Sequence, residues 1–117
     1  MLAKKYRLNK TKDIEKVYKN GGSLVAKILG IKFMENSLDY SRFTFVVSLK
    51  IHKKSTKRNL AKRRMREAIR TNIKLIKPGY DVIFLARPGI IDAGYEDIKS
   101  NIFYVLKKAG LLTTPQS

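Results

Sequence analysis

Residues 57–77 combine dense positive charge with the periodicity of an α-helix. With successive residues turned by about 100°, a helix over residues 58–77 has one side that is mostly small or apolar: Ala61, Met65, Ala68, Ile69, Asn72, Ile73 and Ile76. The opposite side carries a polar strip about 80° wide, formed by Asn59, Arg63, Arg66, Arg70 and Lys74. Lys62 lies on the shoulder between the two sides. Such a helix can bury one face in a core and present a row of guanidinium groups to a polyanion.

The charge of this segment indicates the kind of partner. The chain has a formal net charge of +17, and residues 50–77 hold twelve lysines and arginines but one acid, Glu67. A nucleic acid is the leading partner class for such a field. An anionic membrane is the alternative, but the strip has no Trp or Phe beside its cations, and its apolar side is typical of a core. A merely solvated face is less well supported, because acids do not alternate with bases along the helix.

The rest of the chain predicts a single domain over residues 1–112 and a frayed tail at 113–117. The expected elements are a helix from Thr11 that Gly21 and Gly22 end through the left-handed conformation, strands over 25–35 and 42–50, the basic helix, a buried strand over 80–87 and a helix over 95–109. The order is α-β-β-α-β-α, with room for one extra short strand. The sheet is expected to be one-sided and antiparallel in its first strands. Base rates make the crossover between the strands at 42–50 and 80–87 right-handed.

Candidate catalytic and metal-binding residues are sparse. His52 is the only histidine, which rules out a two-histidine metal site, and its lysine-rich surroundings are typical of a solvated loop. Asp92, Glu96 and Asp97 are better explained as acids at the start of the last helix than as a metal site. The chain has no cysteine and no apolar run long enough to span a membrane. The sequence therefore predicts no catalytic residues and no metal site in the protein, and its composition fits the cytoplasm.

A second surface is predicted on the polar face of the strand at 42–50. Ser48 and Lys50 lie on that face, which we expect near the first helix. With Tyr18 and Phe33 they would form a groove in which an unpaired nucleic acid strand stacks. The alternative is that the aliphatic stripe of the first helix, together with Tyr18 and Phe33, simply fills a core. The core is favoured for Ile14 and Val17, and the two interpretations of Tyr18 stay open.

The segment Arg58-Asn59-Leu60-Ala61-Lys62-Arg63-Arg64-Met65-Arg66 resembles the RNR signature of the bacterial ribonuclease P protein subunit. Residues 13–21 resemble that family's first helix, residues 42–50 its Ser-x-Lys strand and residues 80–88 the strand that follows. The resemblance implies an α+β two-layer sandwich of the ribosomal protein S5 domain 2-like kind. Its mixed sheet would have about four strands and a left-handed βαβ crossover, opposite to the base rate.

The resemblance also implies a function. In that family a large RNA, with magnesium ions held by the RNA, cleaves precursor tRNA at its 5′ end, and the protein alone is not the catalyst. The protein would bind no cofactor of its own, no membrane and no obligate protein partner. By matching motif, the residues that would contact the ribonuclease P RNA are Lys57, Arg58, Asn59, Lys62, Arg63, Arg66 and Arg70. A cleft for the 5′ leader of precursor tRNA would be lined by Ile14, Tyr18, Phe33, Ser48 and Lys50.

One position in this cleft stays open. An aromatic residue that is usual in the family's first strand falls at Lys32 in an ungapped match and at Phe33 with a one-residue shift. Neighbouring residues of a strand face opposite ways, so only one of the two side chains can face the cleft. A ribosomal or general structured-RNA-binding protein is the alternative function, because it would share the same charge. A protein-only nuclease is a third and weaker possibility, since no acid–base set accompanies the basic strip.

Overall fold

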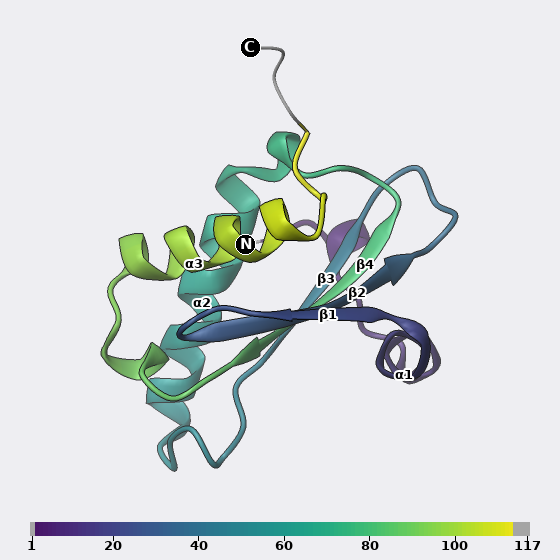
Figure 1. The fold of residues 1–117 in the computed structure, drawn as a ribbon. Helices are drawn as coiled ribbons and strands as arrows, with labels where there is room; N and C mark the ends of the chain where they lie inside the picture. Colours follow the sequence, from purple (N-terminus) through teal and green to yellow (C-terminus); the bar gives the residue numbers. More distant parts are fainter. Residues whose placement is uncertain (1, 114–117) are drawn as a thin grey trace.

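The computed structural model describes residues 2–113, which form a four-stranded sheet with helices on both faces (Figure 1). The sheet order is β1-β2-β4-β3, with β3 and β4 parallel and the other neighbours antiparallel. The elements in chain order are a 3₁₀ turn η1 (Lys4–Tyr6), α1 (Thr11–Asn20), β1 (Gly22–Val25), β2 (Leu29–Glu35), β3 (Arg42–Val46), α2 (Ser55–Thr71), η2 (Ile73–Leu75), β4 (Tyr80–Ala86), η3 (Ile90–Asp92) and α3 (Tyr95–Lys108). The expected α+β fold with a mixed sheet is confirmed.

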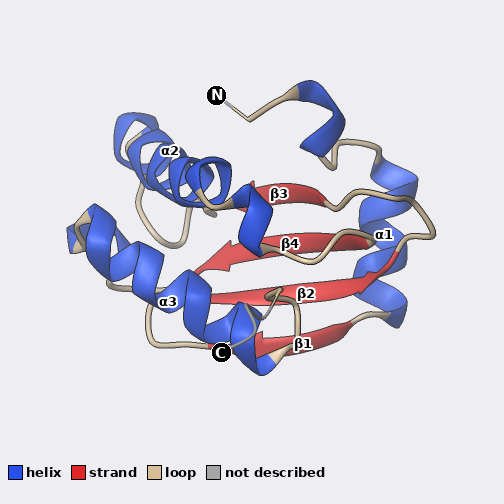
Figure 2. Cartoon of the chain, turned by 90° about the horizontal axis from the view of Figure 1, so that it is seen from above, coloured by secondary structure: helices blue, strands red, loops and turns tan. Residues whose placement is uncertain are grey.

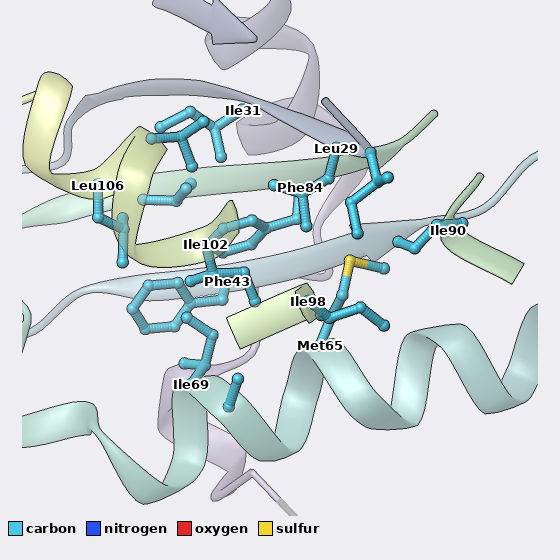
Figure 3. Close-up of a cluster of buried hydrophobic side chains, with 14 of the residues drawn as sticks. Leu29, Ile31, Phe43, Met65, Ile69, Phe84, Ile90, Ile98, Ile102 and Leu106 are labelled. Carbon is cyan, nitrogen blue, oxygen red and sulfur yellow. The ribbon is translucent and has the colours of Figure 1, made fainter. Parts of the chain in front are cut away.

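Alternation along the strands divides the core into two parts. Val82 and Phe84 of β4 face α2 and α3 and belong to the larger cluster, which also holds Met65 of α2 and Ile102 of α3 (Figure 3). Ile83, between them in sequence, faces the other side of the sheet, where α1 packs on β2 and β4. Both faces of β4 are therefore buried, as its nearly continuous apolar sequence predicts.

The β3–α2–β4 crossover is left-handed. In Figure 2 the parallel strands β3 and β4 point to the left, the α2 and α3 layer faces the viewer, and β4 lies below β3. A chain that runs along β3, crosses in front of the sheet through α2 and enters β4 therefore turns to the left of its direction of travel, which is the left-handed sense. The right-handed expectation from base rates is wrong here, and the expectation from the family resemblance is confirmed. The sheet order makes β3 an edge strand, and the left-handed path places α2 on the same face of the sheet as α3.

Two strand predictions need correction. The strand expected over 25–35 is a hairpin of β1 and β2, closed by a tight turn in which Ala26 N–H bonds the Leu29 carbonyl at 2.8 Å. The strand expected over 42–50 ends at Val46, because its last ladder partner on β4 is Leu85. Past that point the chain turns, and the side chain of Leu49 is 67 % exposed, although a strand continued to residue 50 would place it on the same face as the buried Phe43 and Val47.

Helix ends also differ from expectation. The basic helix begins at Ser55 and ends at Thr71, followed by η2, where a helix to residue 77 was expected. Gly21 follows α1 with φ −83°, so the left-handed ending is wrong. Its glycine is required by close approach instead, since a Cβ there would lie 2.5 Å from the Phe33 carbonyl oxygen. Thr113, expected in the frayed tail, donates its N–H to the Leu75 carbonyl at 2.7 Å, and residues 114–117 lie outside the described residues.

Candidate nucleic-acid interface

Helix α2 is anchored through the face that its sequence predicts. Ala61, Met65, Ala68 and Ile69 are at most 2 % exposed and pack against the sheet and α3. On the opposite side, Asn59, Arg63 and Arg70 are exposed. A helix anchored in this way holds the Cβ atoms of its outer face in fixed positions, so the cations form an ordered row and not a flexible tail.

The cations of the strip have different surroundings. The side chain of Arg63 has no hydrogen bond or ion pair within residues 2–113. Arg66 is half-buried and leans toward β3, with its guanidinium carbon 5.9 Å from the centre of the Phe45 ring. Arg70 donates Nε–H to Glu67 Oε1 at 3.0 Å, which lowers the pKa of Glu67 and raises the pKa of Arg70. Lys74, expected to close the strip, lies on η2 beyond the end of α2.

Two arginines of the basic run hold neighbouring backbone. Arg58 Nη1 donates to the His52 carbonyl at 2.9 Å and to the Lys53 carbonyl at 2.7 Å, so it fixes the loop that leads into α2. Arg64 Nη1 donates to the Ala93 carbonyl at 2.8 Å and ties α2 to the segment before α3. Lys57 is exposed, whereas Lys62 is half-buried beside Arg66. Both anchors bond neutral carbonyls, so neither arginine's charge is neutralised.

The α1 face of the sheet holds part of the predicted second surface. Val17 is buried and Ile14 half-buried against Ile83, which confirms the core interpretation for both. Tyr18 is 44 % exposed, and Lys32 Nζ lies 5.8 Å from the centre of its ring. A pocket beside Tyr18 is lined by α1 alone: Lys12, Glu15, Lys16, Tyr18, Lys19 and Asn20.

Lys32, not Phe33, faces α1. Phe33 pairs with Val82 and packs into the α2–α3 side of the core, with its ring over Gly22. Its assignment to a surface shared with Tyr18 is therefore wrong, because the two side chains are on opposite faces of the sheet. Ser48 and Lys50 are exposed, but they lie in the turn after β3 and not on the strand.

A buried ion pair fixes one end of this face. Asp81 on β4 is 5 % exposed and accepts two hydrogen bonds from Arg42 of β3, at 2.9 and 2.7 Å, and one from Asn36 at 2.9 Å. The hydrogen bonding between Arg42 and Asp81 is the largest reason that the pKa of Arg42 is raised. Arg42 also reaches Asp13 of α1 at 3.3 Å, so one guanidinium links β3, β4 and the first helix.

Residues 2–113 contain neither a metal-binding cluster nor a membrane-spanning helix. Within residues 2–113 no group of three or more His, Asp or Glu side chains is placed to hold a metal ion. His52 Nδ1 accepts the Lys54 N–H at 3.1 Å, in keeping with a loop residue. None of the helices in this part of the chain combines the length and apolar character that a membrane crossing requires.

A pocket that the sequence did not predict lies between α2 and β3. It has a volume of about 350 Å³, and its lining includes Arg7, Asn9, Phe45, Lys62 and Arg66. Phe45 lies two residues from the buried Phe43 and shares its face of β3, so alternation alone does not mark it as a surface residue. The one feature of the sequence that pointed toward this pocket was Lys62, because its place on the shoulder of α2 turns its charge toward the sheet.

Comparison with known proteins decides the family. The Ribonuclease P family model matches residues 2–110. The chain belongs to the ribonuclease P protein family. It is 42 % identical over 108 residues to the ribonuclease P protein component of Alkaliphilus oremlandii, covering 92 % of this chain and 94 % of the relative. It is 43 % identical over 105 residues to that of Clostridioides difficile, covering 89 % and 91 %.

Solved ribonuclease P proteins share the fold. The Staphylococcus aureus protein matches with a TM-score of 0.84 and 28 % identity, over 92 % of this chain and 98 % of that one. The Thermotoga maritima protein matches with a TM-score of 0.80 and 30 % identity, over 87 % and 96 %. Family membership makes this chain a protein component of the tRNA-processing ribonucleoprotein.

Proposed function

We propose that the outer face of α2 binds the ribonuclease P RNA. The observation that carries the proposal is the exposed row on a helix whose other side is buried through Met65 and Ile69. The contacts would come from Lys57, Arg58, Asn59, Lys62, Arg63, Arg66 and Arg70. Arginine suits this task because its planar fork bonds two phosphate oxygens at once. Glu67 is the one acid within α2, so little competes with phosphate along the row.

The protein would assist catalysis without performing it. Within residues 2–113 no acid–base set lies beside the basic row. We assign the phosphodiester chemistry to the RNA and to magnesium ions that the RNA would hold. The protein's share is to neutralise phosphates and hold the RNA in place. It would act in the cytoplasm, where precursor tRNA is processed.

A second contact, with the 5′ leader of precursor tRNA, is proposed for the α1 side of the sheet. Tyr18 offers an exposed ring for stacking a base, and Lys32 beside it offers a cation for the adjoining phosphate. Ser48 and Lys50 would contact the leader from the turn after β3, and Ile14 would support the surface from beneath. Lys32 takes the place that Phe33 was expected to fill.

Reconstitution tests the proposal. The purified protein alone should leave precursor tRNA intact, and it should restore 5′ processing at physiological salt when mixed with its own ribonuclease P RNA. With about six phosphate contacts, the logarithm of the affinity should fall with the logarithm of salt concentration with a slope near −5. Equal affinity for arbitrary structured RNA would favour the general RNA-binding alternative. Absence of any processing effect across the salt range would reject the proposal.

A further inference from the structure

The pocket between α2 and β3 joins two kinds of surface. Lys62 and Arg66 reach it from the basic row of α2, and Arg7 reaches it from the segment before α1. Phe45 and Leu8 contribute apolar surface, and Asn9 contributes an amide. None of the described residues that line the pocket is acidic. A ligand with both an anionic group and a flat apolar body would match this combination.

Phe45 provides the surface for stacking. Its ring stacks on Phe84, with centroids 5.4 Å apart and planes 9° from parallel, so the core holds its orientation. The Arg66 guanidinium lies over the Phe45 ring, and the ring is half-buried. A half-buried ring that is held by Phe84 and lines the pocket is a suitable platform for a nucleobase, because every base has a π face, and the neighbouring guanidinium adds a cation.

The free edge of β3 adds backbone groups. Leu8 N–H bonds the outward carbonyl of Phe43 at 2.8 Å, and beyond Arg7 and Leu8 no described segment pairs with this edge. Phe45 follows Phe43 by two residues, so its N–H and carbonyl also point outward, away from β4. These groups lie beside the pocket and can bond the polar edge of a base.

We propose that this pocket binds one unstacked nucleotide of the ribonuclease P RNA. Its phosphate would lie on Lys62 and Arg66, and its base would rest against Phe45 and the chain at Asn9. The inference rests on the proposed RNA contact of α2 and adds to it a feature of the RNA. The partner must present an extruded nucleotide next to the backbone that α2 contacts. A protein segment added to the β3 edge would be the other macromolecular occupant, but the three cations and the absence of lining acids favour RNA.

The isolated protein gives the first test. Amide NMR spectra are recorded during titration with adenosine 5′-monophosphate, ribose 5-phosphate or inorganic phosphate. The nucleotide should shift the Asn9 and Phe45 amides in a saturable way, about tenfold more tightly than either base-free anion. In Asn9→Trp, which fills the pocket from an exposed position, those shifts should disappear. The matched control Ser100→Trp, on α3, should keep them. Equal affinity for all three probes would overturn the inference.

The complex gives the second test. Asn9→Trp should bind ribonuclease P RNA about tenfold more weakly than the wild type, whereas Ser100→Trp should bind unchanged. Phe45→Leu, which keeps an apolar side chain but loses the ring, should show the same loss, with its folding checked by thermal unfolding. If the wild type binds the RNA and Asn9→Trp binds it equally well, the pocket assignment is overturned but the proposed function is not. Failure of the wild type to bind the RNA would overturn the proposed function, so the two failures are distinguishable.

Discussion

Arg63 and Arg64 are adjacent arginines with opposite roles in this structure, and their replacement by alanine separates RNA contact from folding. Arg63 is exposed on the strip. Arg64, about 100° further around the helix, is half-buried and donates to the Ala93 carbonyl at 2.8 Å. Arg63→Ala should therefore weaken RNA binding, whereas Arg64→Ala should mainly weaken the attachment of α2 to the segment before α3.

The magnitudes follow from these contacts. Losing one phosphate contact should make the slope of log affinity against log salt shallower by about 0.9. At physiological salt that change corresponds to a loss of binding free energy of about 1 kcal/mol, or roughly a fivefold loss of affinity. Arg64→Ala removes a charged donor from a backbone carbonyl, and because Arg64 is only half-buried the loss should be near the low end for such bonds, about 1.5 kcal/mol of stability. For a chain of 117 residues this corresponds to a fall in Tm of about 5 °C.

The assay measures both properties for each variant. RNA affinity is determined by anisotropy with labelled ribonuclease P RNA over a series of salt concentrations, and Tm is determined by circular dichroism. Arg63→Lys is the matched control, because it keeps the charge and should retain the salt slope while losing the bidentate fork. Equal losses of RNA affinity for Arg63→Ala and Arg64→Ala, with equal Tm values, would refute the assignment of the strip.

Three further predictions follow from other contacts. Asp81→Ala should destabilise the protein by about 3 kcal/mol in urea unfolding, because it leaves a half-buried cation without its main partner, whereas Asp13→Ala should cost less than about 1 kcal/mol; similar costs would contradict the network. Glu67→Gln should strengthen RNA binding about twofold at low salt, since it frees Arg70 for phosphate, and weaker binding would show that the pair orients the guanidinium. The Glu67 pKa is lowered, so the pair persists above the ordinary carboxyl pKa and is lost as the pH falls through the lowered value. Lys50→Ala should weaken processing of long-leader substrates more than short-leader ones, and an unchanged leader dependence would count against the leader contact.

Helix α2 could be predicted because its pattern is strong in two independent ways. Small and apolar residues recur with the helical period, and Ala61, Met65, Ala68 and Ile69 are all buried where that period places them. The cations follow the complementary positions. The ends of the strands could not be predicted in the same way, because the alternation of the sequence continues after the hydrogen-bonded ladder has ended. Leu49 keeps the parity of Val47, but β4 offers no partner beyond Leu85, and a strand without a partner turns away.

Phe33 shows a different limit. The two-residue period of a strand places it on the same face as Leu29 and Ile31, and all three pack in the larger core cluster. The structure shows that this face is the one that α2 and α3 cover, so Phe33 cannot share a surface with α1. The sequence contained the parity but not the side on which α1 packs. The short strand β1 carried even less signal, because Gly22-Ser23-Leu24-Val25 is defined by its pairing with β2 and not by a pattern of its own.

Three arginines of this chain are held by neutral groups and not by acids, and this has a consequence for RNA binding. Arg7, Arg58 and Arg64 donate to backbone carbonyls of Leu2, His52, Lys53 and Ala93. A carboxylate in any of these places would cancel one positive charge, whereas a carbonyl fixes the side chain and leaves the charge intact. Arginines that serve the fold thus still add to the field that attracts RNA over a Debye length of about 8 Å at physiological salt. Arg64→Glu should accordingly slow RNA association more than Arg64→Gln does, although both lose the full arginine anchor and neither side chain lies in the contact strip.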